Sequence, residues 1–189
     1  VPQGVIALMT RYGMRVVLAH PGGYDLVGET LDVARRSAAD SGGSFAVVDS
    51  MAQAFDGADV VYPKSWAPAA IMHERTRLLR AGETAGLKQL ERDALATNAR
   101  FNDWECNEVL MRRTRGGKAL YMHCLPADVS QVSCAQGEVS RAVFERARLD
   151  TYRQAGYKPF IVAAIVLCTR FADPALVLRR LAECAAPRS

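Results

Sequence analysis

The stretch KALYMHCLPADVSQVS, residues 118–133, decides the fold that we expect for this chain. It opens with an apolar run, residues 119–122, that has the length of a buried strand, and His123 and Cys124 follow directly. Pro126 cannot continue a sheet, because it has no N–H to donate and its φ is fixed. Open α/β sheets bind ligands beyond the carboxyl ends of their strands. We therefore predict a strand that delivers an imidazole and a thiol to a binding site.

Apolar runs of strand length also occur upstream, and they alternate with helical patterns. The expected strands are 14–19, 45–48, 59–63 and 119–122. The expected helices are 2–12, 26–41, 51–55, 70–80, 87–100, 106–114, 139–146, 157–169 and 175–185. This alternation implies a parallel sheet with right-handed crossovers. The prediction is an α/β fold, a doubly wound, Rossmann-like parallel sheet of about four to five strands, with a helical insert and C-terminal helices.

The composition excludes several classes of partner. Half of the residues are hydrophobic and 23% are charged, which suits a packed core. The net charge of +4 is modest and no long Lys/Arg run occurs, so we expect no nucleic-acid partner. The positive balance fits an anionic small molecule. The apolar run 160–167 is too short to span a bilayer, so we expect no membrane partner.

The five cysteines are odd in number and form no C-x-x-C pair, which indicates reduced thiols in a cytoplasmic protein. Cys124 and Cys134 flank one loop, but a zinc site needs more ligands than this loop offers, so we expect no metal. Gly22-Gly23 lacks a dinucleotide or Walker fingerprint, and we expect no cofactor. The opening Val1, without an initiator Met or signal peptide, looks like the middle of a longer polypeptide.

Three predicted strand exits should meet at one edge of the sheet. One carries His20, the next carries Lys64-Ser65-Trp66, and the last is the turn 123–126. Convergent polar groups are what a binding site needs. His20 is either a ligand contact or a plain loop histidine. Lys64 either holds a carboxylate or phosphate, or is a solvated lysine.

The residues of the turn leave alternatives open. His123 either polarises a ligand or is a satisfied core histidine. Cys124 as a nucleophile would need an adjacent base, and successive strand residues face opposite sides, so we favour contact or packing over covalent catalysis. Lys158 stands at a predicted helix start, where a cation opposes the helix dipole. A bound anion would relieve this, which makes Lys158 a candidate ligand contact.

The HCLP sequence, 123–126, resembles the strand-end motif of carbamoyltransferases of the ornithine type. Further segments resemble the knotted branch of that family: 60–68 (VVYPKSWAP), 103–106 (DWEC), 120–128, 132–134 (VSC) and 137–139 (GEV). This branch includes N-acetylornithine carbamoyltransferase and a subgroup of uncertain substrate, to which the chain is most similar. The resemblance implies transfer of a carbamoyl group from carbamoyl phosphate to an amine of an amino-acid-like substrate.

The resemblance also implies an organisation into domains and an assembly. Residues 1–170 would be the amino-acid-substrate-binding domain and 171–189 a C-terminal helix and tail. The carbamoyl phosphate domain, with its S-T-R-T-type loop, is absent from this sequence. The family implies a homotrimer, and its knot would thread the chain near 64–82. The 189-residue chain alone should be inactive.

In the family, backbone carbonyls around the cysteine contact the carbamoyl nitrogen, a role that falls to Cys124 and Leu125, with His123 and Pro126 in the same turn. Lys64, Ser65, Trp66 and Lys158 would then bind the amino-acid-like substrate. Such a reaction needs oriented binding and charge stabilisation more than a covalent nucleophile.

Three departures from the family pattern bear on this implication. Lys64 stands where ornithine enzymes carry an Asp for the α-amino group, so we expect an acceptor whose α-amino group is absent or acylated. Lys158 stands in place of an arginine and loses its bidentate fork. Gln131 stands where a glycine is expected, which would strain the loop at a positive φ.

Two other functions are weighed against this one. A non-catalytic remnant would bind an amino acid or pack in an oligomer. A Rossmann-type dehydrogenase is disfavoured by the missing glycine fingerprint.

Overall fold

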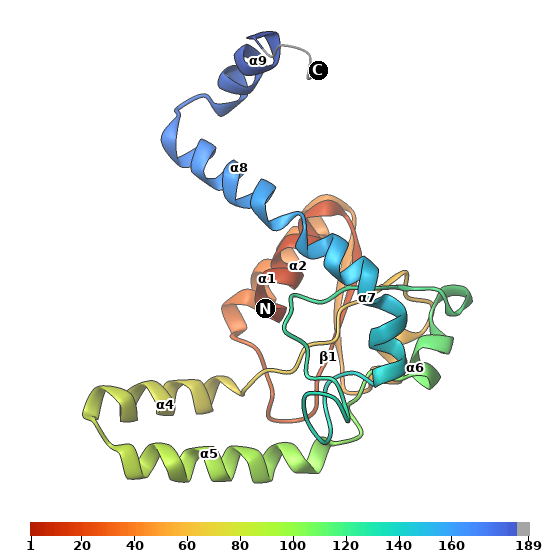
Figure 1. Cartoon of the computed structure of the whole chain (residues 1–189), viewed down its shortest axis with the longest axis vertical. Helices are drawn as coiled ribbons and strands as arrows, with labels where there is room; N and C mark the ends of the chain where they lie inside the picture. Colours follow the sequence, from red (N-terminus) through yellow and green to blue (C-terminus); the bar gives the residue numbers. More distant parts are fainter. Residues whose placement is uncertain (185–189) are drawn as a thin grey trace.

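The computed structural model describes residues 1–184 and shows strands alternating with helices along the chain (Figure 1). The helices are α1 (Pro2–Met9), α2 (Gly28–Ser41), α3 (Met51–Phe55), α4 (Ala69–Ala81), α5 (Thr84–Asn98), α6 (Glu108–Arg113), α7 (Arg141–Ala155), α8 (Lys158–Arg170) and α9 (Pro174–Cys184). Short 3-10 turns are η1 (Thr10–Tyr12), η2 (Ala99–Phe101) and η3 (Arg115–Gly117). The strands are β1 (Arg15–Ala19), β2 (Ser44–Val48), β3 (Val60–Val61) and β4 (Leu120–Tyr121). The predicted α/β class and its helical insert, α4 to α6, are confirmed.

All strand pairs are parallel, as predicted, but they form two pairs instead of one continuous ladder. β1 pairs with β2 from Arg15 opposite Ser44 to Ala19 opposite Val48. β3 pairs with β4 over two residues each. On the other edge of β4 the His123 N–H donates to the Gln154 side chain, 2.9 Å away, so α7 covers that edge.

One helix prediction needs correction, and another extends past the described residues. The helix predicted over 139–146 runs from Arg141 to Ala155, because Ser140 caps its start and no glycine or proline interrupts it before Gly156. The Ser140 hydroxyl accepts a hydrogen bond from Val143 N at 3.3 Å. The last predicted helix, 175–185, corresponds to α9, while Ala185 and the tail 186–189 lie outside the described residues.

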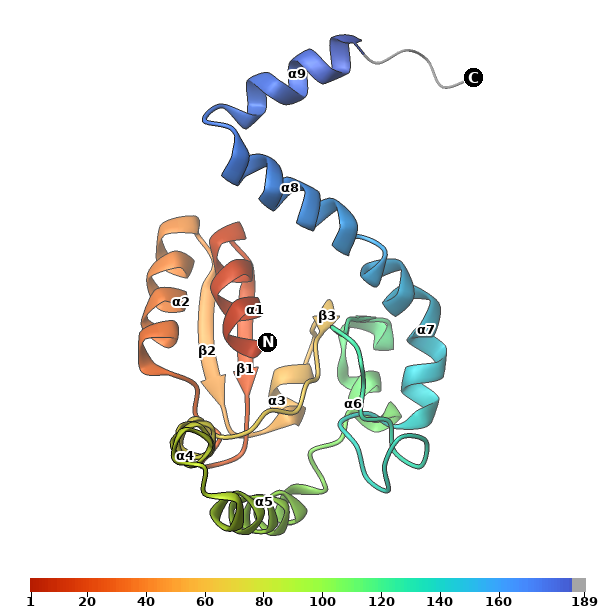
Figure 2. The same cartoon turned by 60° about the vertical axis from the view of Figure 1, so that its left-hand side comes forward.

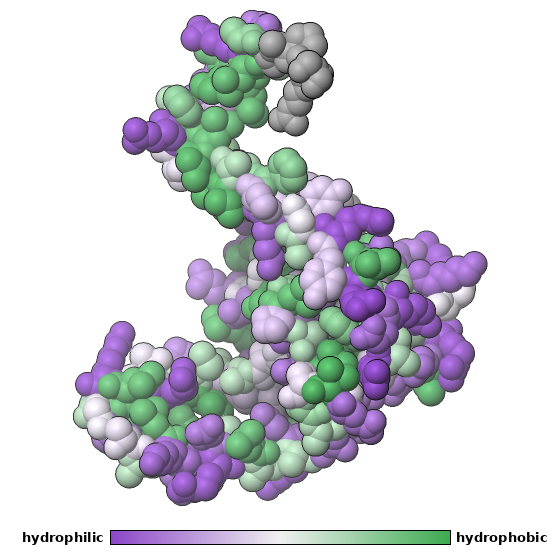
Figure 3. Space-filling view, in the orientation of Figure 1, coloured by the Kyte–Doolittle hydropathy of each residue, from purple (hydrophilic) through white to green (hydrophobic). Residues whose placement is uncertain are grey.

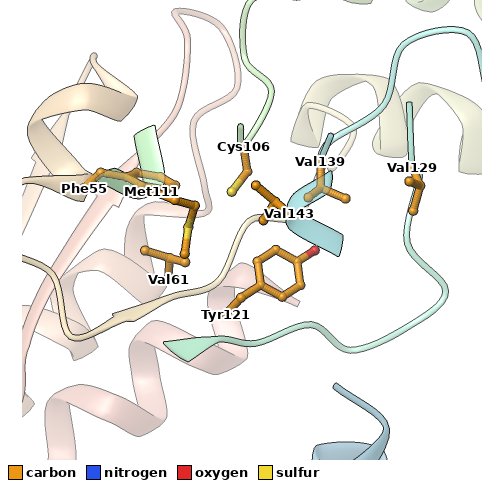
Figure 4. Packing of buried hydrophobic residues seen from close by; sticks show 8 residues of the cluster. All are labelled: Phe55, Val61, Cys106, Met111, Tyr121, Val129, Val139 and Val143. Atoms are coloured by element: carbon orange, nitrogen blue, oxygen red, sulfur yellow. The ribbon is translucent and has the colours of Figure 1, made fainter. Parts of the chain in front are cut away.

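Two apolar clusters hold the strands. The larger one lies around β3 and β4 and joins α3, α6 and α7 (Figure 4). Its buried members are Phe55, Val61, Cys106, Met111, Tyr121, Val129, Val139 and Val143. The smaller cluster joins α1 and α2 to β1 through Ile6, Leu18 and Ala34. Since burying one large apolar side chain stabilises a fold by about 1.5–3 kcal/mol, these clusters hold the strands against the helices.

Two helical segments project from this body (Figures 1 and 2). α4 and α5 form an antiparallel hairpin that leaves the body after β3 (Figure 1). α8 and α9 extend away as an arm, and Figure 3 shows hydrophobic side chains gathered along it. Phe160 of α8 is 71% exposed. Among residues 1–184 no single helix has the length and apolarity to cross a membrane; one pair, α7–α8 with α9, passes that test together but is bent by 116°.

Candidate functional site

The turn that follows β4 is built around a buried imidazole. His123 is 1% exposed, and its ring lies nearly parallel to that of Tyr121, with centroids 6.2 Å apart. The Leu125 N–H donates to His123 Nδ1 at 2.9 Å, so Nδ1 carries a lone pair. Nε2 lies 2.7 Å from Glu138 Oε1. A carboxylate only accepts, so the geometry assigns a neutral imidazole that donates from Nε2.

Both ring nitrogens of His123 are therefore used inside the protein. Of the two roles considered from the sequence, this geometry matches the satisfied core histidine. The ring fixes the direction of the following backbone, in which Leu125 has a φ of +48° and its peptide bond to Pro126 is cis. The imidazole thus holds the turn in shape and leaves the turn's own backbone to face a ligand.

Glu138 is the centre of a buried polar cluster, the Glu138 cluster, which also contains Lys64, Ser65, His123 and Asp128. The Glu138 side chain is only 3% exposed. Besides His123, Lys64 Nζ donates to both carboxylate oxygens, at 2.9 and 3.0 Å. The backbone N–H and the hydroxyl of Ser65 donate to Oε2, the hydroxyl from 2.7 Å. The Asp128 N–H donates to Oε1 from 3.1 Å. Each oxygen thus accepts three hydrogen bonds, and this one carboxylate joins the Lys64 loop to the His123 turn.

The electrostatics of Glu138 follow from these contacts. Burial by itself would raise the pKa of its carboxyl group, but the hydrogen bonds from His123, Lys64 and Ser65 outweigh burial and lower the pKa to about 2. Glu138 is therefore ionised at neutral pH and compensates the charge of Lys64. A buried charge is tolerated where partners of this kind satisfy it.

The three residues 64–66, which follow β3, face two different parts of the protein. Lys64 and Ser65 turn toward Glu138, and the Lys64 side chain remains 19% exposed. Trp66 turns the other way: its Nε1–H donates to Tyr24 O at 2.9 Å, and its ring meets the edge of His20 with centroids 6.1 Å apart. The three predicted strand exits are thus connected, two through Glu138 and the third through Trp66.

Cys124 is half-buried, and within residues 1–184 its thiol makes no hydrogen bond to a His, Asp or Glu side chain. Its neighbour His123 has both ring nitrogens engaged, as described above. The Cys124 carbonyl accepts a hydrogen bond from Lys158 Nζ at 3.3 Å, which brings the start of α8 to the turn. Burial, together with the nearby Cys124 thiol, raises the pKa of Tyr62 to about 12, so Tyr62 stays protonated at neutral pH. The geometry agrees with contact or packing for Cys124.

The loop from Val129 to Gly137 brings Glu138 back to the turn. The Glu138 N–H donates to Asp128 O at 2.9 Å, and the Gly137 N–H donates to Ser130 Oγ at 2.8 Å. A Cβ on Gly137 would lie 2.0 Å from Asp128 O, so only glycine fits there. Gln131 has a φ of +60°, the left-handed conformation that glycine adopts without strain.

The sequence prediction missed the role of Glu138. It named Gly137-Glu138-Val139 only as part of the resemblance, and Gln154 not at all. A carboxylate just before a predicted helix is usually exposed to solvent, where it interacts favourably with the helix dipole. No hydrophobic periodicity in the sequence indicates that Glu138 is buried. Within the described part of the chain, no group of three or more His, Cys, Asp or Glu side chains is arranged to hold a metal ion.

Comparison with known proteins gives the family. The family model of the aspartate/ornithine carbamoyltransferase Asp/Orn binding domain matches residues 1–169. A curated protein of Escherichia coli K12, "Putative carbamoyltransferase YgeW", is 56% identical over 181 residues, which are 96% of this chain and 46% of that protein. An ornithine carbamoyltransferase of Pseudothermotoga lettingae is 31% identical over 123 residues, 65% of this chain and 31% of that protein.

Solved structures agree with this relationship. A variant of N-acetyl-L-ornithine transcarbamylase, complexed with carbamyl phosphate and N-succinyl-L-norvaline, has a TM-score of 0.59 at 26% identity, covering 77% of this chain and 37% of that one. Acetylornithine transcarbamylase complexed with acetylcitrulline has a TM-score of 0.59 at 27% identity, covering 76% and 36%. The chain spans about half the length of the YgeW relative. It belongs to the aspartate/ornithine carbamoyltransferase family, in which it matches the Asp/Orn binding domain.

Proposed function

We propose that this chain is the amino-acid-binding half of a carbamoyltransferase, which moves a carbamoyl group from carbamoyl phosphate to an amine of an amino-acid-like substrate. The observation that carries the proposal is the Glu138 cluster, which locks Lys64 and the turn 123–126 together at the carboxyl ends of β3 and β4. A ligand held at this edge would meet backbone carbonyls on one side and ammonium groups on the other.

The turn would bind the carbamoyl group with its backbone. The carbonyls of Cys124 and Leu125 are acceptors suited to the carbamoyl NH2, and Lys158 would hold the Cys124 carbonyl in place. His123 would act as a positioning residue, since its ring is sealed from solvent. Pro126 would form the apolar edge of the turn. This arrangement works by orientation and needs no covalent intermediate on the thiol.

The acceptor would lie against the segment after β3. Lys64 gives one N–H to each oxygen of Glu138, so a third remains for a ligand carboxylate or acyl oxygen. Ser65 would complete this side, and Trp66, whose indole points toward Tyr24, would contribute by anchoring the segment. Because every lone pair of Glu138 is engaged, we propose an acceptor whose α-amino group is absent or acylated. The solved relatives support this, since their ligands include N-succinyl-L-norvaline and acetylcitrulline.

The wider organisation belongs to the same proposal. Residues 1–170 would be the amino-acid-substrate-binding domain and 171–189 a C-terminal helix and tail, of which 185–189 lie outside the described residues. A carbamoyl phosphate domain would belong to a longer cytoplasmic polypeptide that forms a homotrimer. Its backbone would be knotted near residues 64–82.

The test is a carbamoyl transfer assay on a polypeptide of the relatives' full length and, separately, on residues 1–189. Formation of the ureido product is measured from carbamoyl phosphate with ornithine, Nα-acetylornithine and Nα-succinylornithine. We expect transfer to an acylated acceptor by the long polypeptide and none by residues 1–189. A clear preference for ornithine contradicts the proposed acceptor. Turnover by the 189-residue chain contradicts the proposal that the reaction needs a separate carbamoyl phosphate domain.

One observation favours a second function, packing in an oligomer without catalysis. α8 exposes apolar side chains along its length: Phe160, Ile161, Val162, Ile165 and Val166 are each 58–71% exposed. Such a patch marks a surface that another protein surface covers. In this alternative the chain self-associates through α8 and binds no acylated ornithine. Sedimentation of the parent and of Ile161→Glu, followed by calorimetry with Nα-acetylornithine, separates the two functions.

A further inference from the structure

An open cavity lies beyond the carboxyl ends of β1 and β2, which Figure 2 shows side by side. Its volume is about 440 Å3, and it is lined by His20, Gly22, Val47, Val48, Asp49 and Gln53. The Glu138 cluster contributes none of these residues. We propose that this cavity, the β1–β2 pocket, is a separate binding site for a protonated aliphatic amine.

The strongest indication is His20, whose side chain is only 8% exposed and whose accessible Nε2 has no protein partner in the described residues. Its Nδ1 lies 2.9 Å from Pro21 O, and a carbonyl only accepts, so Nδ1 carries the hydrogen. In the neutral ring Nε2 is then an acceptor. No donor within residues 1–184 reaches Nε2, and the closest ionic group, Asp25 Oδ1, is 4.0 Å away and is itself an acceptor. A ligand N–H would supply the missing partner.

The other residues that line the pocket favour a cationic ligand. Asp49 follows β2 and Gln53 lies in α3, and neither side chain has a hydrogen-bond partner in the described part of the chain. The lining includes one carboxylate and no Lys or Arg. A site of acceptors with a formal negative charge repels anions and favours ammonium groups, whose charged hydrogen bonds to carboxylates are strong. Val47 and Val48 provide an apolar wall for a short methylene chain.

Trp66 offers a direct reading of occupancy, because it meets the edge of His20. The chain contains two tryptophans, so Trp104→Phe leaves Trp66 as the only one. The probe is 1,4-diaminobutane, and 1,4-butanediol is its uncharged counterpart of the same length. We expect a saturable change in Trp66 fluorescence with the diamine and binding about tenfold or more weaker with the diol.

Two substitutions test the residues themselves. Asp49→Asn removes the charge, and His20→Phe removes the acceptor but keeps an aromatic edge for Trp66. Each should weaken diamine binding about tenfold or more, whereas Asp40→Asn, the same charge change at an exposed position of α2, should leave it unchanged. Amide NMR shifts of the parent chain should concentrate at Gly22, Asp49 and Gln53, and this measurement does not depend on any variant folding. Equal binding of diamine and diol, shifts elsewhere, or an unaffected Asp49→Asn overturns the proposal.

Discussion

Replacing Glu138 with glutamine keeps the shape of the side chain and removes the charge on which the cluster depends. The parent carboxylate accepts hydrogen bonds from four residues, Lys64, Ser65, His123 and Asp128. A glutamine amide must turn an NH2 group toward some of these donors, and it leaves the Lys64 ammonium without a counter-charge. Breaking a buried ion pair by removing one partner costs about 3–5 kcal/mol.

The pKa of Glu138, lowered by the same contacts, gives a second magnitude. Its fall from the ordinary 4.5 to about 2 is worth on the order of 3 kcal/mol of folding stability at neutral pH, in the same range. Because the pKa is lower in the folded state, this stability is fully present above about pH 4.5 and is lost as the pH falls through about 2. Glu138→Gln should lack this part of the acid dependence.

The assay is urea unfolding followed by circular dichroism, at pH 7 and at several values down to pH 2.5. Glu145→Gln is the matched control, because Glu145 makes a surface pair with Arg148 at 3.6 Å that is half exposed on both sides. A pair of this kind contributes about 0–1 kcal/mol. A loss below about 1 kcal/mol for Glu138→Gln, or equal losses for both variants, would refute the reasoning.

Three further predictions concern the loop and the core. Gln131→Gly should raise the free energy of unfolding by up to about 1 kcal/mol. The left-handed φ costs a non-glycine residue about 1–2 kcal/mol, and glycine's backbone entropy offsets part of the gain. A lower free energy of unfolding in urea would contradict this expectation. Gly137→Ala should lower the free energy of unfolding by about 3 kcal/mol or more, because the new Cβ meets the Asp128 backbone. Gly4→Ala is the control, because Gly4 has open space around it and the substitution should not lower the free energy of unfolding. Equal unfolding midpoints for the two variants would argue against the close approach at Gly137. Tyr62 should titrate near pH 12 when its ionisation is followed by ultraviolet absorbance. The stability due to its burial should be present below pH 10 and lost between pH 10 and about 12. The Tyr62 signal is identified by its loss in Tyr62→Phe, and its ionisation near pH 10 would contradict its burial beside Cys124.

The sequence was informative where one short segment decides the geometry. Pro126 and the apolar run before it predict a strand that ends at a turn, and β4 ends there. Parallel strands place their carboxyl ends on one side, which is why Lys64 and His123 could be expected to meet. The positive φ of Gln131 was also foreseeable, because a glycine was expected at that position.

What could not be predicted depends on contacts between distant segments. Glu138 reaches the turn only because the loop before it folds back on Asp128, and no local pattern encodes that return. The direction of Trp66 is set by Tyr24, far away in the sequence. The partner of the His123 N–H is equally distant in the sequence, because it is the Gln154 side chain on α7.

The most direct test is an amide NMR titration of residues 1–189 with Nα-acetylornithine and, as a control, with ornithine. We predict saturable shifts for the acylated ligand that centre on Ser65, Cys124 and Leu125 and weaken in Lys158→Met. The absence of shifts in these residues, or a stronger response to ornithine, would contradict the claim that the turn and the Lys64 loop form one site for an acylated amino acid.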